Sequence, residues 1–422
     1  MKKTKVVIML LLIVVLLLPA CAPKKQAVSL RVGVDSGMSP PMITVLGQAV
    51  DAWNAANPDI QVTLEVTPEY WEKIPSGFSA GTAPDIIYNT ITETTSTFGD
   101  LGIYLPLDDY ISKSTAIKPT DFFKPVYDTG VWNGHTWVLP YNWNDIGIVY
   151  NKDMFDKAGV AYPKPGWSWD DFLAAAKALT VDKNGDGTID QFGFYDDSWP
   201  YISVFPFILS NGGAILSPDK SKVVVTDDPA SMEAITFYID LVRKYHVAPT
   251  SKELGNNTNP FATGLVAMQL TRSWAPSTFK DTAPDLKFGA VSVPMKVKRV
   301  NYFEGAGFGI NSKSKYPEQS WKFIEFLVSD AQQKQMADLQ VYFPAKQAII
   351  NQVSWSEPMK AFLDEAQYGV DLQVVQQWET LTSNWYFWLG TAVGGVDPIN
   401  IQTDVAAIQD KCNTELAKHP VK

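Results

Sequence analysis

The sequence predicts an α/β fold in which a mainly parallel sheet is flanked by helices. Apolar residues alternate with polar ones from Leu30 to Val34, recur at helical spacing from Met42 to Trp53, and alternate again from Ile60 to Val66. A strand, a helix and a strand in this order favour a βαβ unit with parallel strands. With 422 residues, 46% of them hydrophobic, the chain is long enough for about two or three domains.

The first ninety residues continue the same pattern. A second helix is expected from Tyr70, with Trp71, Ile74 and Phe78 on one side, and it should end at Gly81. The stretch 83–88 then begins another strand. A first α/β lobe is therefore being built by residue 90.

The stretch Trp137–Ala158 organises the prediction for the rest of the chain. It reads as a strand broken by Pro140, a polar and aromatic segment Tyr141–Asp145, a second strand Ile146–Tyr150, and a helix from Asn151. Such a segment either turns at the surface or crosses between two lobes. A crossing would line a crevice with flat apolar faces beside hydrogen-bonding groups, which suits a sugar ring.

Later segments are mostly helical. Ser168 and Asp171 form a capping box, with Trp167 positioned to pack on Phe172. Further expected elements are a helix over 232–242, an exposed loop over 250–259, a short strand over 291–293, a long helix after Pro317, and a helical C-terminal third with a dense aromatic cluster.

The N-terminus predicts export. Lys2, Lys3 and Lys5 precede an apolar run from Val6 to Leu18, which as a helix would span only about 20 Å, too short for a bilayer. This pattern favours a signal peptide over residues 1–20. Leu-Pro-Ala-Cys at 18–21 resembles the lipobox of bacterial lipoproteins, so Cys21 is the expected lipid attachment site, followed by a flexible tether to residue 29. A plain signal peptide with an incidental cysteine would have the same export consequence.

Charge and cysteine content limit the possible partners. The formal net charge of −10 argues against nucleic acid as a partner. Cys412 is the only cysteine besides Cys21, so no intramolecular disulfide is expected and the hydrophobic cores must hold the fold. No second long apolar segment occurs, which predicts a soluble body held to the membrane by lipid alone.

The residues that could carry catalysis are few. None of the three histidines has a spacing partner for a zinc site or a nucleophile's base. Adjacent carboxylates point apart on a helix or strand, so caps and solvated loops account for the four acidic pairs, which are Asp108-Asp109, Asp170-Asp171, Asp196-Asp197 and Asp227-Asp228. The glycine-rich stretch 305–309 lacks the Lys-Ser/Thr ending of a P-loop, and close backbone packing is the favoured reason for its glycines.

One segment resembles a calcium-binding loop. Its oxygen donors stand at positions one, three, five, seven and nine, and they are Asp182, Asn184, Asp186, Thr188 and Asp190. Position twelve is Gly193 instead of a bidentate glutamate, so a rigid turn built by the side chains of Asx residues is the alternative. We expect no cofactor, with calcium at this loop as an open possibility.

Tryptophan is abundant, with fourteen residues, and four of them sit beside polar groups in the sequence. These are Trp143, Trp199, Trp274 and Trp385. A single tryptophan of this kind belongs more often to a core than to a site. Their shared polar neighbours nevertheless suggest a binding cleft.

Along nearly its whole length the chain resembles the family 1 extracellular solute-binding proteins of ABC transporters, particularly the sugar-binding members. The resemblance lies in the order and spacing of soft motifs together with the lipobox. The segments are 52–60, 79–86, 139–159, 167–190, 264–268 and 317–331.

The resemblance implies a periplasmic-binding-protein-like fold, with two α/β lobes joined by several crossings and a ligand gripped between them by hinge closure. The crossings would fall near Tyr141–Asn144, Val297–Glu304 and Tyr342–Lys346. The N-terminal lobe would then comprise 30–141 plus 301–343, and the C-terminal lobe 142–300 plus 344–422.

The expected function is therefore capture of a carbohydrate, an oligosaccharide, outside the cytoplasm and its delivery to a membrane permease. The expected protein is a lipid-anchored monomer and not an enzyme. Trp143, Trp199, Trp274 and Trp385 are the candidate stacking surfaces. The candidate hydroxyl contacts are Asn89, Asn144, Arg272 and Glu304. Two alternatives stay open: an exported glycoside hydrolase using two carboxylates, and a receptor for another polar solute such as glycerol phosphate.

Overall fold

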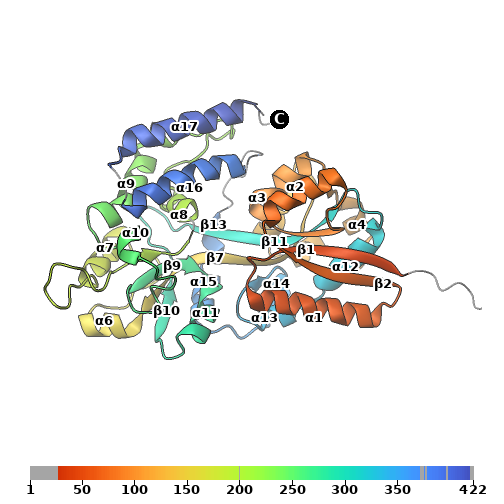
Figure 1. Ribbon diagram of the computed structural model, residues 1–422, viewed down its shortest axis with the longest axis horizontal. Coiled ribbons are helices and arrows are strands. Elements are labelled where there is room, and N and C mark those ends of the chain that lie inside the picture. The colour runs from red at the N-terminus through yellow and green to blue at the C-terminus, as the bar shows by residue number, and fades with distance from the viewer. Residues whose placement is uncertain (1–26, 199, 371–374, 376–377, 396–397, 419–422) are drawn as a thin grey trace, which may run out of the picture.

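The computed structural model describes residues 27–198, 200–370, 375, 378–395 and 398–418. Two lobes lie side by side, and the long strands β7 and β11 run between them (Figure 1). The strands are β1 Val28–Asp35, β2 Ile60–Thr67, β3 Ile86–Thr90, β4 Tyr104–Leu105, β5 Val131–Trp132, β6 His135–Thr136, β7 Leu139–Asn151, β8 Tyr195–Asp196, β9 Met268–Arg272, β10 Phe288–Val291, β11 Asn301–Asn311, β12 Phe343–Pro344 and β13 Gly369–Val370.

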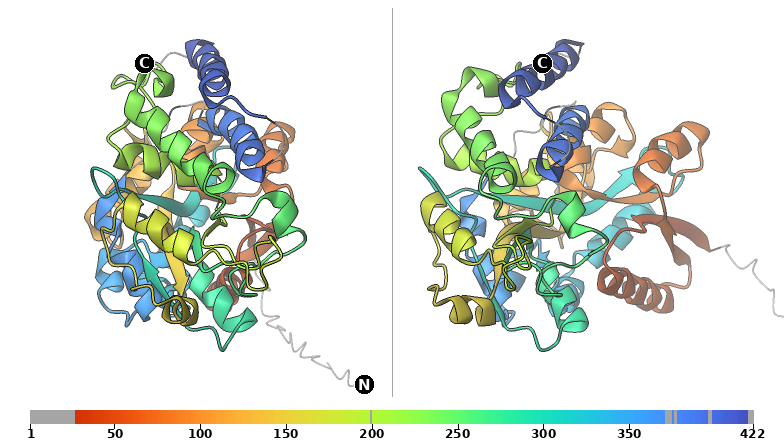
Figure 2. Two further views of the ribbon diagram at one scale, coloured as in Figure 1. Left: turned by 90° about the vertical axis from the view of Figure 1, so that its left-hand side faces the viewer. Right: turned by 60° about the vertical axis from the view of Figure 1, so that its left-hand side comes forward.

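Helices cover both lobes, as two further views show (Figure 2). The α-helices are α1 Pro40–Ala56, α2 Tyr70–Ala80, α3 Ile91–Asp100, α4 Asp108–Lys113, α5 Lys124–Thr129, α6 Lys152–Ala158, α7 Trp169–Ala178, α8 Pro200–Ser210, α9 Pro229–Arg243, α10 Ser251–Leu254, α11 Ala275–Thr282, α12 Pro317–Leu327, α13 Asp330–Ala337, α14 Gln347–Ile350, α15 Glu357–Leu363, α16 Trp378–Gly394 and α17 Ile401–Lys418. Among the described residues, no helix combines the length and apolar character needed to cross a membrane.

The N-terminal lobe is the predicted βαβ arrangement. Strand β1 pairs in parallel with β2 from Val28 opposite Ile60 to Asp35 opposite Thr67, and with β3 on its other side. Helix α1 buries Met42, Val45 and Trp53, which lie on the apolar face that the helical spacing predicted.

The first crossing differs from the prediction in one respect. Residues 139–151 form one continuous buried strand, so neither Pro140 nor the polar segment after it interrupts β7. Pro140 lies next to the start of the strand, opposite Gly307, at a point where the register between β7 and β11 shifts after Ala306. A proline is tolerated at such an irregularity because the ladder hydrogen bonds are already disrupted there.

The C-terminal lobe has fewer parallel pairs than expected. Strand β8 is parallel to β9, but β9 and β10 both pair antiparallel with β7. The reason is the direction of β7, which runs from the N-terminal lobe into the C-terminal lobe. Strands β9 and β10 run the opposite way, toward the N-terminal lobe.

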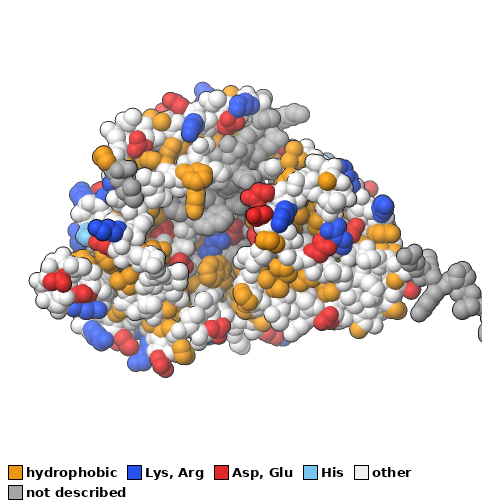
Figure 3. Space-filling view, in the orientation of Figure 1, with side chains coloured by type: hydrophobic (Ala, Val, Ile, Leu, Met, Phe, Trp, Pro, Cys, Tyr) orange, Lys and Arg blue, Asp and Glu red, His pale blue; other side chains and the backbone are white. Residues whose placement is uncertain are grey.

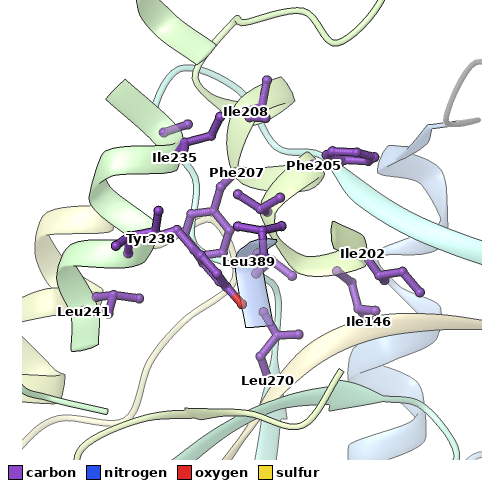
Figure 4. Packing of buried hydrophobic residues seen from close by; sticks show 14 of the residues in the cluster. Ile146, Ile202, Phe205, Phe207, Ile208, Ile235, Tyr238, Leu241, Leu270 and Leu389 are labelled. Atoms are coloured by element: carbon purple, nitrogen blue, oxygen red, sulfur yellow. The ribbon is translucent and has the colours of Figure 1, made fainter. Parts of the chain in front are cut away.

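The large hydrophobic clusters follow the lobes. One contains Ile146 and Leu270 from the strands, Phe207 from α8, Tyr238 from α9 and Leu389 from α16, and Figure 4 shows these side chains packed together. A second fills the N-terminal lobe and continues along the crossing strands into the lower part of the other lobe. A smaller third cluster lies under α2 and α3.

Most of the other predicted elements are present. The capping box of Ser168 and Asp171 forms, and the rings of Trp167 and Phe172 meet edge to face with centroids 5.5 Å apart. The expected loop at 250–259 instead contains the short helix α10, which Thr250 caps with Glu253. The helix after Pro317 ends at Leu327, and α13 follows as a separate helix.

The last passage between the lobes runs through 343–370. Strand β12 pairs with β7, α14 packs on α13, and α15 packs on β10 of the other lobe. Strand β13 then pairs in parallel with the first residues of β11.

Candidate functional site

The carboxyl ends of strands from both lobes meet over the crossing strands. β3 runs antiparallel to β11, with Ile86 opposite Ile310 and Thr90 opposite Ala306, so β3 ends toward the C-terminal lobe. β9 runs antiparallel to β7, with Arg272 opposite Ile146, so β9 ends toward the N-terminal lobe. Ligands of open α/β sheets bind outside the carboxyl ends of strands. The space-filling view shows the surface hollowed between the lobes (Figure 3).

An ion pair lies at this junction. Nη1 of Arg272, the last residue of β9, donates to Oε2 of Glu304 on β11 at 2.7 Å. Nδ2 of Asn144, opposite Glu304 on β7, lies 3.5 Å from the same oxygen. The structure therefore brings together three of the predicted hydroxyl contacts, Asn144, Arg272 and Glu304.

The fourth predicted contact, Asn89, lies at the end of β3 and is fully buried. Its amide donates to the Tyr104 hydroxyl at 2.6 Å, while its Oδ1 has no hydrogen-bond partner among the described residues. The amide of Asn142 on β7 likewise donates to the Tyr88 hydroxyl at 2.9 Å, and its Oδ1 is also without a described partner. Buried acceptors of this kind are costly unless a water or a ligand satisfies them.

Two tyrosines extend the junction toward the N-terminal lobe. Burial raises the pKa of the Tyr88 phenol well above its usual value, against the opposing effect of the Asn142 hydrogen bond, so Tyr88 keeps a proton to donate. Burial also raises the pKa of Tyr342, to which the charge of Glu304 adds and which that of Arg272 opposes. Sequence reasoning missed Tyr88, Asn142 and Tyr342, although Tyr88 could have been found as a polar aromatic residue near a strand end.

Trp274 lies two residues after the end of β9 and is half-buried. It precedes the first turn of α11 and packs against the second hydrophobic cluster with part of its ring. The backbone holds it there, because the N–H of Ser273 donates to the Asp145 carbonyl at 2.9 Å. Of the predicted stacking residues within the described chain, Trp274 is the one that keeps an accessible surface.

Trp143 and Trp385 are core residues. Trp143 is fully buried, stacks on Phe343 with centroids 4.5 Å apart, and donates from Nε1 to the Pro344 carbonyl at 3.0 Å. Trp385 is 1% exposed and packs edge to face on Phe205 and Trp388. Neither ring offers a face to a ligand in this conformation, because neighbouring side chains of its own lobe occupy it.

The pair Asp196-Asp197 differs from the other acidic pairs. Asp170, Asp171 and Asp228 stand at helix starts, as expected. Asp196 instead lies inside the C-terminal lobe, where the Tyr238 hydroxyl donates to it, and burial raises its pKa to about 6. Asp197 reaches solvent on one side and accepts a hydrogen bond from the Gln269 amide at 3.1 Å. The protein around its other sides and repulsion by Asp196 raise the pKa of Asp197 to about 7.

The fully buried carboxyl of Asp145 lies beneath the crossing. Its Oδ2 accepts from Asn301 at 2.9 Å, and its Oδ1 has no partner within the described residues. Burial, reinforced by the nearby Glu365, raises the pKa of Asp145 well above its usual range. A protonated Asp145 avoids the large cost of an unpaired buried charge.

In the calcium-like loop, the carboxylates accept hydrogen bonds from the loop's own backbone N–H groups. Asp182 accepts from the N–H groups of Gly185 and Gly187 at 2.7 and 2.8 Å, and Asp186 accepts from that of Thr188 at 2.7 Å. Asp190 accepts from the Lys183 N–H at 2.6 Å. Within the described chain, no group of three or more His, Cys, Asp or Glu side chains is placed to hold a metal. These hydrogen bonds are typical of a turn rich in Asx residues.

Two predicted residues lie outside the described residues. Trp199, a candidate stacking residue, follows Asp197 and Ser198 directly in the sequence. Cys21, the candidate lipid attachment site, belongs to the first 26 residues together with the signal peptide. Cys412 lies in α17 and is buried, and burial raises its thiol pKa to about 12.

Solved structures show a similar fold. An ABC substrate-binding protein from Listeria monocytogenes in complex with cycloalternan matches with a TM-score of 0.83 and 24% identity, over 93% of this chain and all of that one. This likeness supports the two-lobed architecture.

Proteins related by sequence align over a smaller part of this chain. A protein of Brucella abortus (strain 2308) that is named as a binding protein is 29% identical over 289 residues, which is 65% of this chain and 66% of that protein. The maltotriose-binding protein of Pyrococcus abyssi (strain GE5 / Orsay) is 21% identical over 330 residues, covering 76% of this chain and 68% of its own.

The sequence pattern of one family covers most of both lobes, from residue 41 to residue 334. This range includes β3 and β9, which end at the junction, and the crossing strands β7 and β11. The chain belongs to the bacterial extracellular solute-binding protein family.

Proposed function

We propose that this protein captures a carbohydrate, an oligosaccharide, outside the cytoplasm and delivers it to the permease of an ABC transporter. The observation that carries the proposal is the junction itself, where Arg272, Glu304 and Asn144 meet and the half-buried Trp274 follows Arg272 by two residues. Aromatic faces stack on sugar rings, while carboxylate, guanidinium and amide groups bind the hydroxyls at the ring's edge.

The buried amide oxygens of Asn89 and Asn142 support the same ligand. Both are acceptors without a described partner, and a sugar hydroxyl or an ordered water would satisfy either. Similar proteins point in this direction: the Listeria structure holds cycloalternan, and the Pyrococcus relative binds maltotriose.

Capture requires the lobes to close on the ligand. Strands β7 and β11 and the passage through β12 and α14 connect the lobes, and such connections act as a hinge when the lobes rotate. Closure would bring Ser39 and Tyr342 of the N-terminal lobe onto a ligand held by Arg272 and Trp274, and would present both lobes together to the permease.

A thermal-shift screen of mono- and oligosaccharides, followed by calorimetric titration of the hits, tests the proposal. We expect one-to-one binding of at least one oligosaccharide by the monomer. The bound sugar should be recovered intact after prolonged incubation, because we propose a receptor without hydrolytic activity. Release of shorter sugars would support the glycoside hydrolase alternative.

We further propose that Cys21 carries the lipid that holds the protein at the outer face of the cell membrane. Its support is the lipobox at 18–21 directly after the apolar run. Replacing Cys21 with serine should move the protein from the membrane fraction to the soluble extracytoplasmic fraction. A variant that stays with the membranes would rule out this anchor.

A further inference from the structure

The ion pair between Arg272 and Glu304 has a geometry that bears on which ligands the cleft accepts. The two side chains are 17% and 5% exposed, and 2.7 Å separates Nη1 from Oε2. A guanidinium in a mostly water-excluded position is a strong binding group for carboxylates and phosphates, because its N–H donors match their oxygens. Here a carboxylate of the protein already occupies that position.

The surrounding charges have the same sign as Glu304. Asp196 and Asp197 both lie near enough to Arg272 for its charge to lower their pKa values, although burial outweighs that effect. Arg272 therefore has three acidic side chains near it, of which Asp196 and Asp197 are partly protonated near neutral pH. An anionic ligand would have to displace Glu304 and would then lie beside two further acidic residues, whereas the hydroxyls of an uncharged sugar can be added to the pair without displacing it.

We infer that Glu304 sets the charge specificity of the cleft by neutralising Arg272, so that uncharged saccharides are accepted and anionic solutes are rejected. This inference rests on the proposed function, because it concerns the same cleft, but it adds a specificity-determining residue and a ligand class. Acidic saccharides and glycerol phosphate are then excluded by like-charge repulsion.

The test replaces Glu304 with glutamine, which keeps the size and one oxygen acceptor but removes the charge. The probes are maltotriose and mannotriose as uncharged saccharides, and trigalacturonate and glycerol 3-phosphate as anions, measured by calorimetric titration. The wild-type protein should bind an uncharged trisaccharide and neither anion. Glu304→Gln should gain affinity for an anion of at least about tenfold, because Arg272 becomes available.

A second ion pair provides a matched control. Arg299 and Glu365 are paired outside the junction, with exposures of 23% and 4% that resemble those of the first pair. Glu365→Gln breaks that pair and should leave the preference for uncharged over anionic probes unchanged. In the double variant Glu304→Gln/Arg272→Gln the gained anion affinity should disappear, which assigns the gain to Arg272.

The outcomes separate this inference from the proposed function. If the wild type binds an uncharged saccharide but Glu304→Gln gains no anion affinity, the role of Glu304 is overturned and the function stands. Tighter wild-type binding of trigalacturonate than of any uncharged probe would overturn the inference by itself, even if Glu304→Gln failed to fold. Binding of glycerol 3-phosphate alone would overturn both.

Discussion

At the scale of single residues, Trp274 is the side chain that we propose as the stacking surface for a sugar ring. It combines a half-exposed ring with a fixed position after β9, directly beside the Arg272 end of the ion pair. A stacking residue needs both properties, because a fully buried ring has no free face and a mobile ring loses entropy on binding.

Trp274→Ala should therefore cost about 1–3 kcal/mol of saccharide affinity, the magnitude expected for burying a large aromatic face. Trp71→Ala on α2 is the control, since Trp71 is also half-buried but packs against the third hydrophobic cluster. Calorimetric titration measures both. Equal affinity of Trp274→Ala and the wild type would remove Trp274 from the site.

The buried carboxyl of Asp196 predicts a dependence of stability on pH. Burial raises its pKa from 3.8 to about 6, so between these values the folded protein binds more protons than the unfolded chain and stability falls as the pH rises. Asp196→Asn removes this loss and can still accept from Tyr238. The melting temperature of the variant, relative to the wild type, should be more favourable at pH 8 than at pH 4. A difference that is the same at both pH values would contradict the assignment.

At this scale the sequence identified part of the junction. Asn89, Asn144, Arg272, Trp274 and Glu304 were predicted from residue type and from the resemblance, whereas the strands β9 and β11 that position Arg272 and Glu304 were not predicted. The sequence could not show that Trp143 and Trp385 are core residues and not site residues. Burial of a tryptophan depends on partners far away in the chain, here Phe343 and Phe205. The burial of Asp196 depends in the same way on Tyr238.

At the scale of elements, the contact between β7 and β11 explains the glycine-rich stretch of the sequence. A Cβ on Gly307 would lie 2.2 Å from the Leu139 carbonyl oxygen and 2.9 Å from the Pro140 Cα, and both are backbone atoms that cannot turn aside. The close backbone packing that was expected between the lobes is found at Gly307, but between the paired strands β7 and β11.

Gly307→Ala should lower the free energy of unfolding by about 1–3 kcal/mol, since the strands must separate to admit the methyl group. Gly47→Ala in α1 is the control, because its Cβ would meet nothing within 4 Å and alanine favours a helix. Chemical denaturation measures both. A Gly307→Ala protein as stable as the wild type would show that the strands adjust freely.

The loop 182–190 is the second element with a testable expectation. Asp182, Asp186 and Asp190 accept hydrogen bonds from the loop's backbone, so we predict that the turn keeps its conformation without a metal. Calcium at about 1 mM should leave the melting temperature unchanged. A rise that is lost in Asp186→Ala would instead establish a calcium site at this loop.

Elements were predicted best where the hydrophobic period was clear. The spacing of α1 and the alternation of β1 and β2 gave their position and type. β7 was expected in two pieces, because Pro140 and five polar or aromatic residues usually end a strand, but pairing with β11, β9 and β10 keeps it extended. Such pairing partners lie more than a hundred residues away, so no local pattern contains them.

At the scale of the whole molecule, the account depends on two lobes whose strand ends face one another. The order β2-β1-β3-β11-β7-β9-β8 places the crossing strands in the middle of the sheet and one lobe on each side. The sequence alone indicated two or three domains, and the number and position of the crossings came from the resemblance. The hydrophobic clusters do not divide strictly by lobe, because the second one also contains Phe192, Phe261 and Phe279 of the C-terminal lobe.

Calorimetric titration of the wild-type protein with a panel of uncharged oligosaccharides tests the central claim most directly. The account predicts saturable one-to-one binding of at least one of them, with the affinity reduced in Trp274→Ala. Absence of binding to every sugar, together with binding of a peptide or an anionic solute, would contradict it.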